Sequence, residues 1–346
     1  MIIDASSPAP MSSKSASRRV RARKSWILPA VCAGYLAMVL AVWLVMTRLG
    51  DRWWPATVLL LAPRWPYALP MVVLWPLVLP GRRWWCAAWV GVAASVVLFP
   101  ILGFRLSLPS ASGARGEIRL LTCNVHRQHL NARELEAFVR ESQPDVVALQ
   151  GWSETGHEGL FDNSAWHVRR EGELLVASRL PIGGVRPIDL SDGASASRGE
   201  IGAAAIFELR TPRHSIYLVN LHLASPHAGL GVFSEDGGGK LTDNVDRRRR
   251  ESELVRAACD HLESRLLLAG DFNTPDDSPI FRECWEDFSD AFAERGSGLG
   301  YTYIIRRTQL RIDHILAHPG TQFLRCWVGP EVGSPHRPLV ADVKFE

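Results

Sequence analysis

Two long apolar runs dominate the first third of the chain. Residues 26–46 form an uncharged run of Leu, Val, Ala and Trp, and at about 1.5 Å rise per residue a helix of this length crosses a bilayer. The uncharged run 86–104 is similar, and Trp84 and Trp85 precede it where an aromatic belt would lie. Both runs therefore predict membrane-spanning helices. A signal peptide is the alternative for the first run, but that run is long and no small-residue cleavage site follows it.

A third apolar run, residues 54–80, is the weakest membrane candidate. Arg64 interrupts it, and its six prolines would kink a helix unless neighbours satisfy the freed carbonyls, so we expect either a span or a re-entrant segment. Basic residues precede the first run, and Arg82 and Arg83 precede the run 86–104. The positive-inside rule places both of these basic segments on the cytoplasmic side. Three spans would put the rest of the chain outside, and two would put it in the cytoplasm. The loop charges favour a multi-pass protein of the cell membrane with an extracytoplasmic C-terminal part.

Residues 117–346 show a different pattern, in which short β-type runs alternate with amphipathic helical patterns. Residues 105–116, rich in Ser, Pro, Ala and Gly, are expected to link them to the membrane anchor, residues 26–104, which follows a basic cytoplasmic tail, residues 1–25. The expected strands are 118–123, 146–149, 174–177, 203–209, 216–223, 266–269 and 312–316. The alternation predicts one α/β domain.

Two helices are predicted between these strands. The first starts after Asn131, a suitable N-cap, and would bury Leu135, Phe138 and Val139. The second covers residues 246–264 and would bury Leu254, Val255, Ala258 and Leu262. The Gly- and Asp-rich residues 229–244 before it are expected to form a loop, of the kind that covers a cleft.

Charge is divided unevenly between the two parts. Residues 1–116 carry 13 Lys and Arg against 2 Asp and Glu, whereas residues 117–346 carry 26 against 34, so the net charges are +11 and −8. The basic part is also the apolar part, so its charge indicates membrane topology and not a nucleic-acid surface. The acidic part lacks the surplus positive charge expected of a duplex-DNA binder, although a local basic groove remains open. The four arginines at 247–250 are most simply a solvated turn, with a phosphate-facing patch as the alternative.

The six cysteines are scattered, with no CxxC pair and no short His/Cys spacing, so a zinc site is unsupported. Disulfides in the C-terminal part are an alternative if it faces an oxidising compartment. Single cysteines of this kind are more often small core residues.

Polar residues that apolar packing does not require stand at the ends of several expected strands. They are Asn124, His126, His222, Asp271, Asn273, Asp313 and, after the last of these strands, His336. Any one of them is most simply a turn residue. Five such ends in one domain predict a shared site.

Taken together, these motifs resemble the endonuclease/exonuclease/phosphatase superfamily. The most specific part of the resemblance is the sequence GDFNTP at 270–275, joined to RIDH at 311–314, and the SRLPI at 178–182 is similar to a further family segment. The resemblance implies a four-layered α/β sandwich, with two facing mixed sheets flanked by helices and active-site loops at one end.

The resemblance also implies hydrolysis of a phosphoester by activated water with a divalent cation, Mg²⁺ or Mn²⁺. It implies that His336 handles the water, that Asp313 fixes the tautomer of His336, and that Asp271 and Asn273 hold the nucleophile, the metal or a phosphate oxygen. His222 and Asn124 would donate hydrogen bonds to the transition state, with Asn124 also a candidate metal ligand. The arginines Arg179 and Arg337 are candidate substrate-binding residues.

Two departures from the family pattern affect its metal ligands. Gly151 stands where the family has its principal metal-binding Glu, and Pro335 stands where it has an Asp. A site without these carboxylates should bind Mg²⁺ more weakly. Glu154 or His126 would be placed to compensate.

The leading hypothesis is therefore a hydrolase acting on ester bonds, a phosphodiesterase more than a monoesterase, anchored in the bilayer through residues 26–104. Its substrate is a nucleic acid, a lipid headgroup or a small phosphodiester, and no protein partner is predicted. The alternative is a catalytically impaired domain of the same superfamily that binds a ligand without turnover. A purely structural membrane protein would leave the polar strand ends unexplained.

Overall fold

The computed structural model describes residues 13–79, 84–107, 115–126, 130–153, 159–191, 202–212, 214–226, 237–262 and 265–345. The chain divides into two compact units, one formed by residues 1–42 and 65–98 and the other by residues 43–64 and 99–346. The second unit thus includes residues 43–64, which the hydrophobic pattern groups with the membrane anchor.

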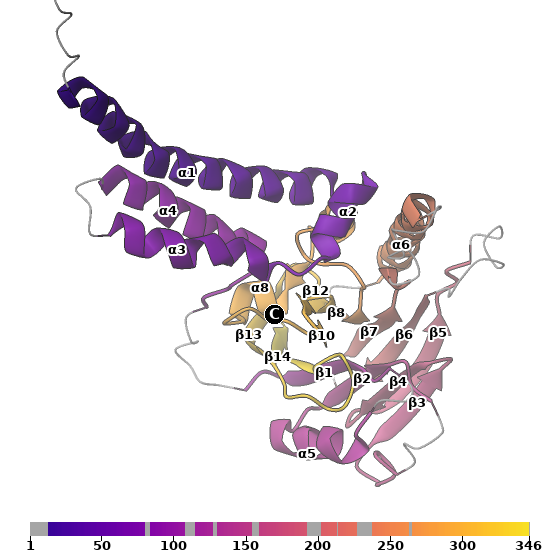
Figure 1. The fold of residues 1–346 in the computed structure, drawn as a ribbon. Coiled ribbons are helices and arrows are strands. Elements are labelled where there is room, and N and C mark those ends of the chain that lie inside the picture. Colours follow the sequence, from indigo (N-terminus) through magenta and orange to yellow (C-terminus); the bar gives the residue numbers. More distant parts are fainter. Residues whose placement is uncertain are drawn as a thin grey trace, which may run out of the picture. The chain divides into compact units, whose positions relative to one another are not determined.

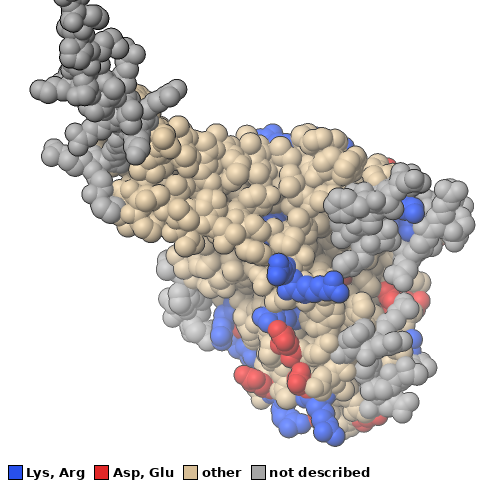
Figure 2. Space-filling model, viewed as in Figure 1, with Lys and Arg blue, Asp and Glu red and all other residues tan. Residues whose placement is uncertain are grey.

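The first unit is made of apolar helices. It contains most of α1 (Ser13–Leu49), the short 3₁₀ helix Trp65–Ala68, α3 (Leu69–Val78) and α4 (Trp84–Val96), and the part of these helices that is not grey in Figure 2 shows almost no charged side chains. Two helical stretches, Trp26–Leu49 and Trp84–Ile101, are long and apolar enough to cross a membrane. The Tyr35 hydroxyl donates to the Tyr67 carbonyl at 2.7 Å.

The middle apolar run is broken rather than continuous. Helix α2 (Trp54–Leu61) and the helical stretch Trp65–Val78 are bent by 76° at the break between them. Pro63 and Pro66 flank this break, and a proline removes a backbone donor and clashes with the preceding turn. The bend divides the run between the two units, because Arg64 belongs to the second unit and Trp65 to the first.

The second unit is built on two six-stranded mixed sheets (Figure 1). The first has the spatial order β13 (Thr321–Val328), β14 (Leu339–Phe345), β1 (Ile118–Asn124), β2 (Val146–Gln150), β4 (Leu174–Ser178) and β3 (His167–Glu171). The second has the order β5 (Ile182–Pro187), β6 (Ala203–Arg210), β7 (Ser215–His222), β8 (Leu266–Asp271), β12 (Asp313–Ala317) and β9 (Ser289–Asp290). A separate hairpin pairs β10 (Tyr303–Ile305) with β11 (Thr308–Leu310).

Alternation along the strands divides their side chains between two faces. In β1, Leu120 belongs to the core between the sheets, whereas Leu121 and Cys123 pack under helix α5 (Ala132–Ser142). On the other sheet, helices α6 (Gly237–Cys259) and α7 (Pro279–Trp285) cover the outer face of β7 and β8. The short helix α8 (Ala291–Arg295) also contributes to the inner core through Phe292. The predicted four-layered sandwich is confirmed.

The predicted strands and the first helix are present in the structure, and all six cysteines are buried and unpaired. The Asn131 side chain accepts from the Glu134 amide at 3.4 Å, which caps α5 as expected, and the residues predicted to be buried on that helix are buried.

Three expectations for the next helix were wrong. Residues 237–244 are helical and not loop, because α6 begins at Gly237. Val255 is buried on this helix, but Leu254 is 37% exposed, since the helix turns Val255 and not Leu254 towards the sheet. The predicted solvated turn at 247–250 lies in mid-helix, and Arg248 is fully buried. The part of the expected loop before residue 237 lies outside the described residues.

A polar contact joins the two sheets within the sandwich. The Gln150 side chain at the end of β2 donates to the Asn220 side chain in β7 at 2.7 Å, and both residues are fully buried. Asn220 in turn donates to the carbonyls of Leu149 and Leu175 at 3.1 and 3.2 Å. Since a buried amide without partners is costly, this arrangement favours one alignment of the sheets.

Candidate active site

The ends of five strands meet at one end of the sandwich. Parallel pairing aligns Asn124 with Gln150 in the first sheet, and His222 with Asp271 in the second. Strand β12 runs antiparallel to β8, so its first residue, Asp313, lies beside Asp271. The carboxyl ends of parallel strands share an edge, and the polar strand ends therefore gather although they are far apart in sequence.

A glycine turn places the carboxylate of Asp271. Gly270 has φ +147°, and a Cβ atom at this position would lie 1.9 Å from the Leu221 carbonyl, so only glycine fits the close approach of β7 and β8. Asp271 Oδ1 then accepts from the Asn273 amide at 2.8 Å, and the Asn273 side chain donates to the Leu223 carbonyl at 2.7 Å. Asn273 is 4% exposed, and these two hydrogen bonds hold the turn that follows Asp271.

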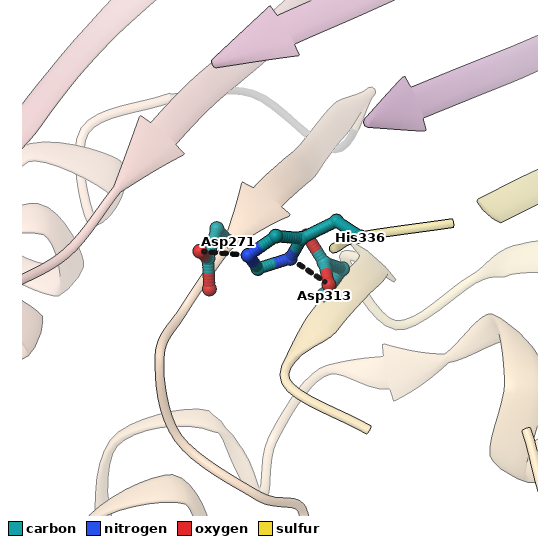
Figure 3. A group of neighbouring side chains, drawn as sticks. All are labelled: Asp271, Asp313 and His336. Atoms are coloured by element: carbon teal, nitrogen blue, oxygen red, sulfur yellow. Dashed lines mark hydrogen bonds and ion pairs between the residues drawn. The ribbon is translucent and has the colours of Figure 1, made fainter. Parts of the chain in front are cut away.

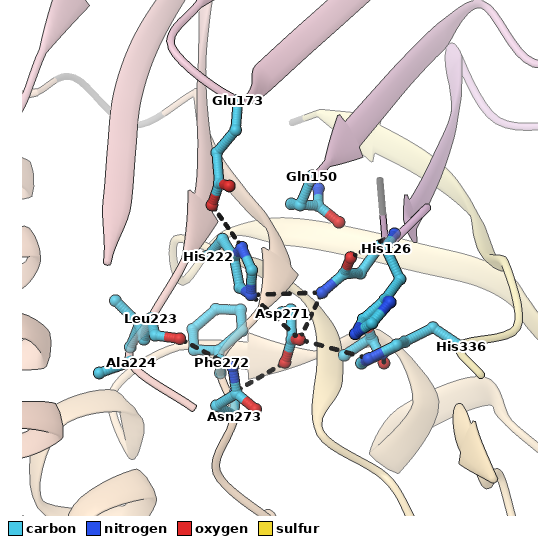
Figure 4. A network of polar contacts seen from close by, with 12 residues as sticks. His126, Gln150, Glu173, His222, Leu223, Ala224, Asp271, Phe272, Asn273 and His336 are labelled. Carbon is cyan, nitrogen blue, oxygen red and sulfur yellow. Dashed lines mark hydrogen bonds and ion pairs between the residues drawn. The ribbon is translucent and has the colours of Figure 1, made fainter. Parts of the chain in front are cut away.

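The other oxygen of Asp271 is the centre of the site (Figure 4). Asn124 Nδ2 donates to Asp271 Oδ2 at 2.8 Å. His336 Nε2 and His222 Nε2 lie 3.6 and 3.7 Å from the same oxygen. Asp271 is 1% exposed, and burial raises the pKa of its carboxyl while the His336 charge opposes that rise.

His336 is held by a second buried carboxylate (Figure 3). Its Nδ1 lies 2.9 Å from Asp313 Oδ2, which leaves Nε2 directed at Asp271. Burial alone would lower the pKa of His336, but the charges of Asp313 and Asp271 outweigh it and raise this pKa to about 9. The ring of Tyr303 covers His336 at a centroid distance of 4.8 Å. The two carboxylates therefore orient the His336 ring and favour its protonated form.

His222 forms a second histidine–carboxylate pair with Glu173, a residue that the strand-end reasoning missed. His222 Nδ1 lies 2.6 Å from Glu173 Oε1, and the hydrogen bond from Glu173 outweighs burial in raising the pKa of His222. Glu173 immediately precedes β4, which is antiparallel to β2. The beginning of an antiparallel strand lies at the same edge as the ends of its neighbours, and that rule would have identified it.

Three of these side chains form a candidate metal-binding cluster. One ligand atom each of Asp271, Asp313 and His336 lies within 4.8 Å of the others, and Asp313 Oδ1 is buried without a hydrogen-bond partner among the described residues. Gly151 has φ +61°, and a Cβ there would lie 2.9 Å from Asn124 Oδ1, so this backbone does not admit the Glu that the family pattern has. Pro335 supplies no side-chain ligand. The donor set fits a hard cation with fewer carboxylates than usual.

The remaining candidate residues are distributed as follows. His126 is exposed, and its amide donates to Asn124 Oδ1 at 2.9 Å. Arg179 follows β4 at the opposite end of the sheet, where it donates to the Pro144 carbonyl and covers the Trp166 ring. Arg337 adjoins His336, but its guanidinium pairs with Glu331 at 2.6 Å. Glu154 lies outside the described residues.

This fold, with its His–carboxylate pairs at one end of a four-layered sandwich, defines a phosphoesterase class. The model of the Endonuclease/Exonuclease/phosphatase family matches residues 121–336, more than half of the chain. The chain therefore belongs to the endonuclease/exonuclease/phosphatase family, whose enzymes use divalent metals.

Solved structures agree on the fold. The 3′ phosphatase NExo from Neisseria, bound to a product DNA hairpin, is 18% identical with a TM-score of 0.50, over 66% of this chain and 99% of that one. A humanized TDP2 from D. rerio is 15% identical with a TM-score of 0.50, over 65% and 98%. A family protein from Bacteroides vulgatus is 17% identical with a TM-score of 0.50, over 66% and 99%. A sequence search of curated proteins found no match.

The His336 pKa gives a direct test of the site geometry. In metal-free protein we expect this imidazole to stay protonated at pH 7 and to lose its proton near pH 9, because its pKa is raised. Asp313→Asn removes the largest contribution that raises this pKa, so the proton should be lost at lower pH. NMR titration of the histidine signals measures both values, with His336→Gln for assignment. Glu136→Gln, at an exposed position on α5, should change nothing, and a wild-type pKa at or below about 6.5 would contradict the geometry.

Proposed function

We propose that the domain hydrolyses phosphodiesters by attack of water, in a membrane-tethered protein. The observation that carries the proposal is the convergence of the His336 and His222 Nε2 atoms on Asp271 Oδ2. A phosphoryl group needs a base for the water and donors for the charge that develops on its oxygens. This site supplies both within a few ångströms.

The protonation states divide the work between the residues. His336 carries a proton at neutral pH, so it acts as a donor to a phosphoryl oxygen or to the leaving group. Asp271, whose pKa burial raises, is the group placed to accept a proton from water. Asn124 Nδ2 donates towards the same point, and Glu173 keeps His222 oriented. Asp313 holds the His336 ring without contacting the substrate.

A divalent cation would be held by Asp271 and by Asp313 Oδ1, the buried oxygen that has no partner among the described residues. When bound, it supplies positive charge next to the phosphoryl oxygens. Hard cations usually take six or more oxygen ligands, so a site with two carboxylates should be weak unless another residue contributes. Glu154, three positions after Gly151, is the proposed contributor.

The metal proposal predicts measurable binding that depends on these carboxylates. Titration of the full-length protein in detergent micelles with Mn²⁺ and Mg²⁺ should show one weak site, which Asp271→Asn removes. Glu154→Ala should weaken the affinity by about tenfold, within the range found for losing one supporting group of a metal site. Glu136→Ala is the matched control. If Glu154→Ala binds the ions as the wild type does, the proposed compensation by Glu154 is refuted. If the wild type binds neither ion, the metal proposal itself is refuted.

Connectivity supports an extracytoplasmic domain. Residues 43–64 and 99–346 form one compact unit, so both ends of the intervening residues 65–98 lie on the same side of a membrane. These residues therefore cross the membrane an even number of times, twice or not at all. The helical stretch Trp65–Val78 spans only about 21 Å, which is short for the bilayer's hydrocarbon core of about 30 Å. If α1 crosses once, the basic residues at its start lie opposite the domain. The positive-inside rule places those residues in the cytoplasm.

The substrate class follows from charge and location. A DNA hairpin is the product bound to the Neisseria relative. In this chain, however, residues 117–346 carry a net charge of −8, which opposes the phosphate neutralisation that duplex binding requires. A lipid headgroup or a small phosphodiester next to the bilayer fits the tethered, acidic domain better.

Measured turnover separates this function from the alternative, a binding domain without activity. Gly151 and Pro335, which replace two carboxylates of the family pattern, favour that alternative. Full-length protein in micelles should hydrolyse bis(p-nitrophenyl) phosphate with Mn²⁺ present. His336→Ala should reduce kcat at least about a hundredfold, the usual scale for a proton-transfer group. His261→Ala, at an exposed histidine near the end of α6, should leave the rate unchanged. Absence of His336-dependent turnover on this ester, on plasmid DNA and on phospholipid vesicles would favour the binding domain.

A further inference from the structure

Residues 43–64 comprise the last residues of the first candidate span, Trp26–Leu49, and the segment that follows it, and they belong to the unit that contains the candidate active site. Arg64 is the clearest case, because its guanidinium is only 7% exposed and makes two hydrogen bonds to the Asp277 carboxylate, at 2.9 and 3.0 Å. It also donates to the carbonyls of Leu60 and Ile101, at 2.9 and 3.1 Å. Arg64 makes the run 54–80 a poor membrane span, and its charge is satisfied by protein groups. One of them is the carboxylate of Asp277, four residues after Asn273.

Leu61 connects α2 to the catalytic histidine. Its side chain is 4% exposed and forms a small apolar cluster with Tyr303, Leu310 and Ile312. Tyr303 pairs with His336 in an isolated β-bridge and places its ring 4.8 Å from the imidazole. Ile312 directly precedes Asp313, the carboxylate that orients this histidine. One leucine therefore supports both members of the His336–Asp313 pair.

Asp51 makes a third connection, to the start of helix α7. It is 6% exposed, and its Oδ2 accepts from the Ile280 amide at 3.1 Å. Burial lowers the pKa of the neighbouring Arg248 guanidinium, and the negative charge of Asp51 is the largest influence that opposes this. Arg248 Nη1 donates to the Asn273 carbonyl at 2.7 Å. Asp51 thus holds the start of α7 through the Ile280 amide, while Arg248 on α6 holds the turn next to Asp271.

We propose that residues 43–64 are a positioning segment of the active site, which holds Asn273, Asp313 and His336 in place through Asp51, Leu61 and Arg64. The contacts differ in chemistry. Leu61 packs against Tyr303 and Ile312, next to His336 and Asp313, whereas Arg64 and Asp51 contact Asp277 and the Ile280 amide in the segment after Asn273. The chain that emerges from the first span is therefore part of the domain. Cleaving the domain from its anchor at residues 105–116 would remove this segment along with the membrane helices.

Histidine NMR of full-length protein in micelles tests the proposal whether or not the protein turns over a substrate. Leu61→Ala should shift the His336 ring signals, because it loosens Tyr303 against the imidazole, and Leu61→Met, which conserves volume, should restore them. Leu59→Ala, on the same helix but outside the Tyr303 cluster, is the matched control. If Leu61→Ala does not fold, Leu61→Val is the milder substitution. His336 signals that are identical in the Leu59 and folded Leu61 variants would overturn the proposal.

Kinetics supply the second readout, which rests on the proposed function. Leu61→Ala should lower kcat for bis(p-nitrophenyl) phosphate by about tenfold or more with KM nearly unchanged, since small displacements of reacting groups are costly. Leu61→Met should recover most of the rate. An unchanged kcat with displaced His336 signals would also refute the positioning role. A wild type without turnover would refute the proposed function, while the NMR comparison still decides the positioning segment.

Discussion

The buried carboxylate of Asp271 constrains the rest of the candidate active site. A carboxylate that is 1% exposed stays charged only if donors and positive charges replace the water it has lost. Here the replacements are the Asn124 amide, the Asn273 backbone amide and the two histidine Nε2 atoms. Removing one partner of a buried pair commonly costs about 3–5 kcal/mol, so these groups cannot be treated as independent.

These partners come from strand ends and from the loops beside them, and the sheets fix their convergence. The parallel register of β7 and β8 sets His222 beside Asp271, and the antiparallel register of β12 brings in Asp313. Asn124 arrives from the opposite sheet, whose alignment the buried Gln150–Asn220 contact favours. The carboxylates of Glu173 and Asp313 then orient the two imidazoles. The fold and the charge state of the site therefore depend on one another.

Much of this was predictable from local sequence patterns. The β-type runs and their polar ends indicated the sheets, and parallel pairing explains why Asn124, His222 and Asp271 meet. Glu173 was missed because it immediately precedes its strand, β4, and a search for polar residues after strands does not include that position. Arg248 was taken for a solvated residue, since a run of arginines does not show which of them a tertiary contact will bury.

The sequence indicated that Arg64 and the prolines interrupt the apolar run 54–80, and the structure breaks the run there. The sequence did not indicate that the run is divided between two units, or that Arg64 pairs with Asp277, more than two hundred residues away. No local pattern reveals such a contact. The same holds for Leu61, whose apolar character fits a bilayer and a protein core equally well.

The central claim is that Asp271 and its two imidazoles activate water. The most direct measurement is a single turnover of bis(p-nitrophenyl) phosphate in ¹⁸O-labelled water, with the protein in excess and the product analysed by mass spectrometry. The account predicts one solvent ¹⁸O atom in the phosphate of each product molecule in that first turnover. Unlabelled phosphate, which would mean that a protein oxygen was transferred to phosphorus or that the aryl C–O bond was cleaved, or no product at all, would contradict it.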